Sequence, residues 1–184
     1  QSRFSFNIKD ISLVPEVAEE QKSSVGETGG FEANYQNMAG KVICGVDIGG
    51  TNNKVVLVAD GKIRCFKEHS WFPAKFKIPA EQIEPIYMLV KLVKVKVSLE
   101  DNNSINQAQK YELLENLDKA MTREASYDFI KDVVNATEAA LKKDLIEIDA
   151  IGVSFPDVVI RDKIVGGEVY KMRGMRENPD INYE

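Results

Sequence analysis

The sequence predicts an α/β fold built on a mixed sheet, and three features of its 184 residues indicate this. Residues 41–69 have the pattern of three consecutive short strands. Residues 127–143 have the pattern of an amphipathic helix, and an apolar strand over 148–155 follows it directly. A helix that precedes a buried strand predicts a crossover connection, which brings that strand parallel to an earlier one.

Composition indicates a globular protein and argues against two classes of partner. Hydrophobic residues make up 43% of the chain and charged residues 29%, and the formal net charge is −5. A general nucleic-acid binder would carry a basic face instead. No apolar run reaches the roughly 18 residues that a membrane helix needs, so no membrane partner is expected. Cys44 and Cys65 lack metal-ligand spacing and predict buried thiols of a cytoplasmic protein, although a disulfide between neighbouring strands stays open.

The three strands of the first segment are each justified by their residues. Val42 to Val46 is a short apolar run, typical of a strand buried on both faces. Lys54 to Val58 and Lys62 to Phe66 are the next two strands. Asp60-Gly61 between them is a strong hairpin-turn signal.

The turn between the first two strands carries the clearest chemical signal. Asp47 precedes Gly49, Gly50 and Thr51. Glycines tolerate positive φ and let the backbone approach a ligand closely, and successive N–H groups in such a turn form an anion site. A carboxylate beside that turn can hold a hydrated Mg²⁺. An ordinary glycine-rich hairpin is the alternative, but the order of strand, acid, glycines, hydroxyl and strand favours phosphate binding.

The segment after the third strand is harder to interpret. Trp71, Phe72 and Phe76 are expected in the core, and the lone His69 is expected to be a packed or surface residue rather than a metal ligand. Residues 83–90 have helical spacing, whereas 93–99 alternate valine or leucine with lysine or serine, which is a strand pattern.

Two helices and three strands are expected beyond residue 100. Gln107 to Met121 predicts a helix with Tyr111, Leu114, Leu117 and Met121 on its apolar face. Ser126 is the expected N-cap of the helix over 127–143. After the buried strand over 148–155, Val158 to Ile160 and Lys163 to Val165 predict a hairpin about Arg161-Asp162.

The sequence around the Gly49–Thr51 turn resembles a known protein family. Asp47-Ile48-Gly49-Gly50-Thr51-Asn52-Asn53-Lys54 resembles the first phosphate motif of the ROK sugar kinases and repressors, which belong to the superfamily of actin, hexokinase and heat-shock-chaperone ATPases. The resemblance implies a ribonuclease-H-like (actin-like ATPase) lobe with ATP and Mg²⁺ as cofactors. It implies that Asp47 holds magnesium through water and that Gly49, Gly50, Thr51 and Asn52 contact phosphates. Lys54 either adds positive charge or lies on a solvated strand face.

A second, weaker resemblance concerns the substrate. Ile151 to Pro156 is similar to the ROK strand that ends in Gly-hydrophobic-Pro-Gly, with Asp157 where a glycine is usual. Gly166-Gly167 is similar to the glycine that follows the next short strand. Asp157, Gly166, Gly167 and Glu168 are therefore expected at the sugar cleft. Residues 73–122 are longer than the family's connection and are expected to be an insertion that shapes the cleft rim or an oligomer contact.

The resemblance also predicts the organisation of the whole protein. Residues 1–40 are expected to be an extension, and 41–184 the N-terminal lobe of a two-lobe carbohydrate kinase that acts on a hexose or amino sugar. The family's general base lies in an Asn-Asp motif that this sequence lacks, so no catalytic residue is expected here and the second lobe is expected to be absent from this chain. Alone, the chain is expected to be nearly inactive.

Two alternatives to a kinase stay open. A non-catalytic sugar sensor of the repressor branch would need a helix-turn-helix, and residues 1–40 have no pair of amphipathic helices. Another actin-like ATPase is the second alternative. The expected partners are a small-molecule sugar and a second copy of the chain in a homodimer, and nucleic acid is not expected.

Overall fold

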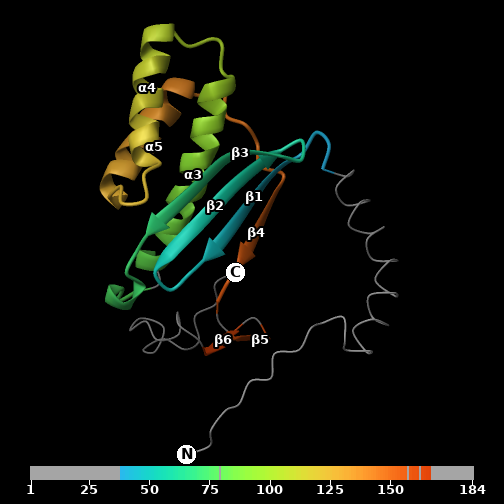
Figure 1. Ribbon diagram of the computed structural model, residues 1–184, viewed down its shortest axis with the longest axis vertical. Helices are drawn as coiled ribbons and strands as arrows, with labels where there is room; N and C mark the ends of the chain where they lie inside the picture. The colour runs from blue at the N-terminus through green and yellow to red at the C-terminus, as the bar shows by residue number, and fades with distance from the viewer. Residues whose placement is uncertain (1–37, 79, 157, 162, 167–184) are drawn as a thin grey trace, which may run out of the picture. The chain divides into compact units, whose positions relative to one another are not determined.

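The fold is described from a computed structural model that places residues 38–78, 80–156, 158–161 and 163–166. Within these residues a four-stranded sheet has the order β3-β2-β1-β4, and a separate two-stranded sheet pairs β5 with β6 (Figure 1). The elements in chain order are β1 (Val42–Ile48), β2 (Asn52–Ala59), β3 (Lys62–Ser70), the 3-10 helix η2 (Pro73–Lys75), α3 (Ala80–Asp101), α4 (Gln107–Ala120), α5 (Tyr127–Leu141), β4 (Ala150–Ser154), β5 (Val158–Ile160) and β6 (Lys163–Gly166).

The first three strands form the antiparallel meander that the sequence predicts. β1 pairs with β2, and β2 pairs with β3, with an irregularity between Leu57 and Val58. Asp60 and Gly61 have φ values of 51° and 70°, so the predicted turn is the left-handed kind that matches strand twist. The strands are longer than predicted, and Asp47 lies within β1 rather than after it.

The predicted crossover is confirmed, but three helices rather than one make it. β4 pairs parallel to β1, with Ile43 opposite Ala150 and Asp47 opposite Ser154. α3 contacts β2 and β3, and α4 and α5 pack against α3 and against each other. The four-stranded mixed sheet and its three α-helices therefore form an α/β fold, with the helices gathered on one side of the sheet (Figure 1).

The strand predicted over residues 93–99 is wrong, because these residues belong to α3. Val93, Val95, Val97 and Leu99 are all buried, as is Leu92 directly before them. A helix that packs against the sheet on one side and against α4 and α5 on others is buried around most of its circumference, so every second residue can be apolar without a strand. Lys96 still reaches solvent, where it pairs with Glu100 and Asp118.

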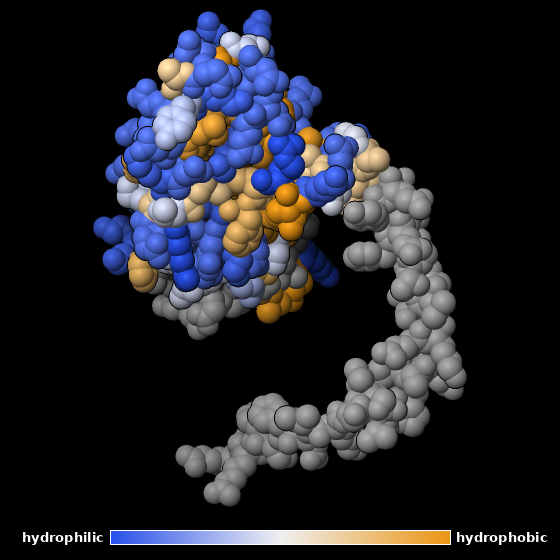
Figure 2. All heavy atoms as spheres, turned by 45° about the horizontal axis from the view of Figure 1, so that its top comes forward, coloured by the Kyte–Doolittle hydropathy of each residue, from blue (hydrophilic) through white to orange (hydrophobic). Residues whose placement is uncertain are grey.

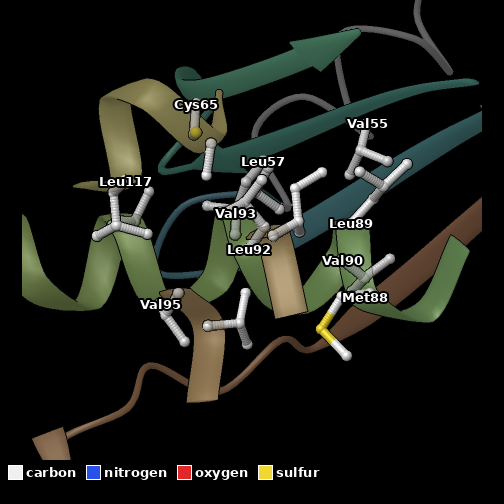
Figure 3. Close-up of a cluster of buried hydrophobic side chains, with 14 of the residues drawn as sticks. Val55, Leu57, Cys65, Met88, Leu89, Val90, Leu92, Val93, Val95 and Leu117 are labelled. Atoms are coloured by element: carbon white, nitrogen blue, oxygen red, sulfur yellow. The ribbon is translucent and has the colours of Figure 1, made fainter. Parts of the chain in front are cut away.

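The main core lies between α3 and the meander. Figure 3 shows Val55 and Leu57 from β2 lying close to Leu89, Leu92 and Val93 of α3, with Leu117 of α4 toward Cys65. Cys44 and Cys65 also lie in this core as free, buried thiols, and burial raises the pKa of each to about 11. The segment 73–122, expected as an insertion at a rim, thus includes the helix that fills the core.

α4 and α5 begin at side chains that cap them. Asn106 accepts from the N–H of Ala108 at 2.9 Å, and the predicted cap Ser126 accepts from the N–H of Phe129 at 3.3 Å. Leu117 of α4 is buried as predicted, but Tyr111 is 73% exposed.

β4 differs most from its prediction, since it is exposed along its whole length instead of buried. Ile151 and Val153 leave 54% and 59% of their surface open to solvent. Among the described residues β4 has a neighbouring strand on one side only. Hydrophobic side chains do reach the surface within a mostly hydrophilic face, as Figure 2 shows.

The remaining predictions concern the ends of the chain. The hairpin about residues 161–162 is confirmed as β5 and β6. The predicted extension over residues 1–40 lies almost wholly outside the described residues. No described helix has the length and apolar character needed to cross a membrane.

Candidate functional site

The turn between β1 and β2 is tight, and its first glycine is required by close packing. The N–H of Gly49 donates to the backbone oxygen of Asn52 at 3.0 Å. A Cβ at position 49 would lie only 2.4 Å from that oxygen, so any larger residue would push the turn open. The glycine is needed for this approach rather than for positive φ, because positive φ among the described glycines occurs at Gly40 and Gly61.

Two hydrogen bonds from Trp71 hold this turn in place. Its indole Nε1 donates to the carbonyl of Gly49 at 2.7 Å, and its backbone N–H donates to the carbonyl of Thr51 at 3.0 Å. Trp71 is 4% exposed and packs edge-on against Phe76, with ring centroids 5.6 Å apart. The prediction that Trp71 and Phe76 are core residues is confirmed, whereas Phe72 is 67% exposed. No pattern in the sequence indicates that Trp71 also holds the turn.

Two N–H groups of the turn remain available to a ligand. Gly50 and Thr51 are exposed, and their N–H groups have no hydrogen-bond partner among the described residues. Trp71 holds the carbonyl groups of Gly49 and Thr51, on either side of these two donors. Adjacent unpaired N–H groups on a fixed turn suit a phosphate oxygen.

Asp47 and Lys54 lie next to each other beside this turn. They are register partners on β1 and β2, and Lys54 Nζ lies 3.2 Å from Asp47 Oδ2. Both side chains are about half exposed, on the face of the sheet opposite the helices. The structure thus brings together the acid and the base that the motif predicts, and places Ser154 of β4 opposite Asp47.

A shallow hollow of about 530 Å³ runs across this face of the sheet. Asp47, Lys54 and Ser154 supply its polar atoms, and Val56 and Phe66 line it with apolar surface. Sequence reasoning missed Ser154, which lies within an otherwise apolar strand. The one feature that could have indicated Ser154 is its place at the end of a strand predicted to run parallel to β1.

Asn52 is near the turn but its side chain is already engaged. Its amide Nδ2 donates to Glu68 Oε1 at 2.5 Å, across β2 and β3. The amide oxygen, rather than a free donor, therefore faces the turn, 3.3 Å from where a Cβ of residue 49 would be. The bond to Glu68 uses one of the two N–H donors of the Asn52 amide, and the phosphate contact of Asn52 stays a prediction.

The expected sugar-cleft residues are mostly beyond what the structure describes. Asp157, Gly167 and Glu168 lie outside the described residues. Gly166 is the last residue of β6, in the two-stranded sheet. The grouping of these four residues at one cleft stays a prediction.

A hydrated magnesium ion fits the side chains at the turn. Mg²⁺ keeps several waters and is commonly held by one or two carboxylates together with phosphate oxygens. Asp47 supplies one exposed carboxylate there. Among the described residues, no three His, Cys, Asp or Glu side chains converge into an all-protein metal site.

The opposite face of the sheet buries an unusual set of polar residues. Asn53, Lys67 and His69 are all less than one-tenth exposed, and Lys67 Nζ donates to the carbonyl of Thr122. Burial lowers the pKa of Lys67 to about 8, against the Glu124 and Glu68 carboxylates that raise it. Burial, and then the charge of Lys67, lower the pKa of His69 to about 4. His69 is thus a packed, neutral residue, which is one of the two environments expected for it.

Comparison of the chain with protein-family models, with curated proteins and with solved structures found no match.

Proposed function

We propose that this chain is the phosphate-binding N-terminal lobe of an ATP-dependent carbohydrate kinase of the ROK type, with a ribonuclease-H-like fold. The expected lobe combines an N-terminal antiparallel meander, a helical crossover and a strand parallel to the first. The order β3-β2-β1-β4, with β4 parallel to β1, supports that arrangement.

The observation that carries the proposal is the Gly49–Thr51 turn. It offers two N–H groups that have no partner among the described residues, on a backbone that Trp71 holds in place, with a carboxylate and an ammonium group alongside. Phosphoryl transfer depends mainly on positioning and charge stabilisation, and fixed donors provide both without reorganisation.

Each residue then has a role that follows from its place. The N–H groups of Gly50 and Thr51 bind terminal phosphate oxygens, and the Thr51 hydroxyl adds a further donor. Asp47 would hold a hydrated magnesium ion through its water shell, and the ion would neutralise part of the phosphate charge. Lys54, which pairs with Asp47 in this structure, would add positive charge beside the phosphates.

The wider proposal includes the expected substrate and setting. The transferred group goes to a hydroxyl of a small sugar, in a cytoplasmic homodimer. The free, buried state of Cys44 and Cys65 supports a reducing compartment. An ADP-release assay with a panel of hexoses and amino sugars, on the full-length protein, tests the sugar. No turnover with any sugar would remove the carbohydrate part of the proposal.

Nucleotide binding is tested on the chain itself by titration calorimetry with a non-hydrolysable ATP analogue and Mg²⁺. We expect Asp47→Asn to weaken binding about tenfold, equivalent to about 1.4 kcal/mol, and to remove the dependence on magnesium. Glu112→Gln is the control, because it removes the same charge from an exposed position on α4. Absence of binding to the unaltered chain, or an equal loss in both variants, would contradict the proposal.

A further inference from the structure

Asn52, the first residue of β2, is held by a side chain from the next strand. Its amide Nδ2 donates to Glu68 Oε1 of β3 at 2.5 Å. The register partner of Asn52 is Ser70 rather than Glu68, so the bond runs diagonally across the two strands. Long side chains reach such diagonal neighbours. The bond therefore adds a contact that the backbone ladder between β2 and β3 does not supply.

This bond acts on the Gly49–Thr51 turn through the backbone of Asn52. The carbonyl of Asn52 accepts from the N–H of Gly49 at 3.0 Å, and this hydrogen bond closes the turn. Trp71 holds the carbonyl groups of Gly49 and Thr51. The turn is thus held by Trp71 at Gly49 and Thr51, and by Glu68 at the residue that follows them.

The bond also sets the direction of the Asn52 amide. A carboxylate only accepts hydrogen bonds, so the NH₂ end of the amide must face Glu68. The amide oxygen lies on the other side, 3.3 Å from where a Cβ of residue 49 would be. Hydrogen bonds to an ionised acceptor are stronger than neutral ones. A neutral or shorter side chain at position 68 would therefore hold Asn52 less firmly.

Glu68 belongs to a row of alternating charge that crosses three strands. Asp47, Lys54 and Glu68 are register partners on β1, β2 and β3. Arg123 continues the row, with its Nη2 3.7 Å from Glu68 Oε1. Opposite charges on opposed strand residues attract, whereas an unpaired carboxylate near a phosphate would repel it. Arg123 therefore offsets the one drawback of holding Asn52 with an acid.

Arg123 is itself placed by contacts with β3. Its Nε donates to Ser70 Oγ at 3.0 Å, and its backbone carbonyl accepts from the N–H of Ser70 at 3.1 Å. The preceding residue, Thr122, accepts at its carbonyl from the ammonium group of the buried Lys67. The connection between α4 and α5 is thus tied to the end of β3, and this brings the guanidinium to Glu68.

We propose that Glu68 is a positioning residue for the Gly49–Thr51 turn, and that Arg123 supports it by holding and neutralising its carboxylate. Glu68 keeps Asn52 in the place that closes the turn, and the closed turn presents the N–H groups of Gly50 and Thr51 to phosphate. The inference rests on the proposed function, because it names further residues on which nucleotide binding depends.

A matched ion pair elsewhere on β3 separates positioning from general stabilisation. The side chains of Arg123 and Glu68 are 50% and 29% exposed, and pairs at such positions contribute little to the free energy of unfolding. Arg64, nearer the start of β3, pairs with Asp101 at 2.7 Å with similar exposure. Arg64→Gln is therefore the control for Arg123→Gln, since each removes one arginine that links β3 to a neighbouring segment.

Hydrogen exchange in the ligand-free chain tests the hold on the turn. NMR measures the exchange rates of the Gly49 N–H and the Trp71 Nε1–H, which both donate within the closed turn. Glu68→Thr suits a strand but ends short of Asn52, and we expect it to raise both rates about tenfold and Arg123→Gln about threefold. Arg64→Gln should leave the rates unchanged. Unchanged rates in Glu68→Thr, or equal changes in the control, would overturn the proposal.

A double variant tests whether Arg123 acts through Glu68. Adding Arg123→Gln to Glu68→Thr should raise the two exchange rates no further, because the carboxylate that Arg123 holds is already gone. A full additional increase would overturn the supporting role of Arg123, since the guanidinium would then hold the turn by another route.

Nucleotide affinity tests whether the hold matters for binding. Glu68→Gln and Glu68→Thr remove the same charge, but only glutamine keeps an acceptor long enough to reach Asn52. In titration calorimetry with a non-hydrolysable ATP analogue and Mg²⁺, we expect Glu68→Thr to bind about fivefold more weakly than Glu68→Gln. Equal affinities would overturn the positioning role, even if the exchange rates differ.

The two measurements distinguish failure of this inference from failure of the proposed function. Absence of nucleotide binding to the unaltered chain would contradict the proposed function, while the exchange rates still decide whether Glu68 holds the turn. Binding to the unaltered chain, with exchange rates that Glu68→Thr leaves unchanged, would overturn this inference alone. Arg123→Gln alters an exposed side chain and provides the exchange test if Glu68→Thr does not fold.

Discussion

The two edges of the four-stranded sheet invert the usual relation between polarity and burial. On β3, Lys67 and His69 are buried, whereas on β4, Ile151 and Val153 are largely exposed. The helices explain the difference, since α3 lies against β2 and β3 and leaves β4 uncovered among the described residues. Which strand the helices cover, and not the residue type, decides what is buried here.

The comparison is sharpest between two neighbouring valines. Val46 of β1 and Val153 of β4 are register partners on the same face of the sheet, but Val46 is 3% exposed and Val153 is 59% exposed. We expect Val46→Ala to lower the free energy of unfolding by about 2.5 kcal/mol and Val153→Ala by less than about 0.5 kcal/mol. Urea unfolding of the two variants measures this. Similar losses would mean that β4 is covered in solution.

The buried His69 on β3 predicts that acid lowers the stability of the fold substantially. His69 has a pKa lowered to about 4, against the ordinary value of 6.5. Between pH 6.5 and 4 His69 is therefore protonated in the unfolded chain but not in the folded chain. The free energy of unfolding falls as pH decreases through this window. We expect this linkage to lower the free energy of unfolding by about 2 kcal/mol between pH 6.5 and 4. This is somewhat less than the full pKa shift of His69 would correspond to.

Because His69 is the only histidine in the chain, NMR titration of its ring protons gives its pKa without assignment by mutation. His69→Gln should flatten the decline in stability between pH 6.5 and 4, while the decline at lower pH remains. A ring pKa near 6.5 would show that His69 is not buried as described.

The smallest expected effect on stability is on the open face of the sheet. Asp47 and Lys54 form an ion pair with both partners about half exposed, and such pairs contribute little. Asp47→Asn should change the free energy of unfolding by less than about 0.5 kcal/mol, even though it weakens binding of magnesium and nucleotide. Thermal unfolding without ligand measures the first effect. A large loss of stability would assign Asp47 a structural role instead of a binding one.

The meander was predictable because each of its signals is local. The apolar runs that begin at Val42 and at Val55 and the Asp60-Gly61 turn depend on residues close in sequence. The cap at Ser126 is local in the same sense. The turn at Gly49 was predictable for its position, but the close approach that requires glycine there became clear only from the structure.

The misread parts depend on contacts between distant segments. Val93, Val95 and Val97 alternate with polar residues, and only the packing of α3 between the sheet and two helices distinguishes this from a strand. The exposure of Ile151 could not be predicted, because its sequence is that of a buried strand. The buried Lys67 was missed because a lysine in a strand normally indicates a solvated face.

Amide chemical-shift mapping tests the central claim most directly. The ¹⁵N-labelled chain is titrated with a non-hydrolysable ATP analogue, with and without Mg²⁺. The account predicts that the largest shifts occur at the amides of Gly50 and Thr51, that Trp71 Nε1 follows them, and that removing magnesium weakens all three. Saturable shifts centred on any other part of the chain, with Gly50 and Thr51 unmoved, would contradict it.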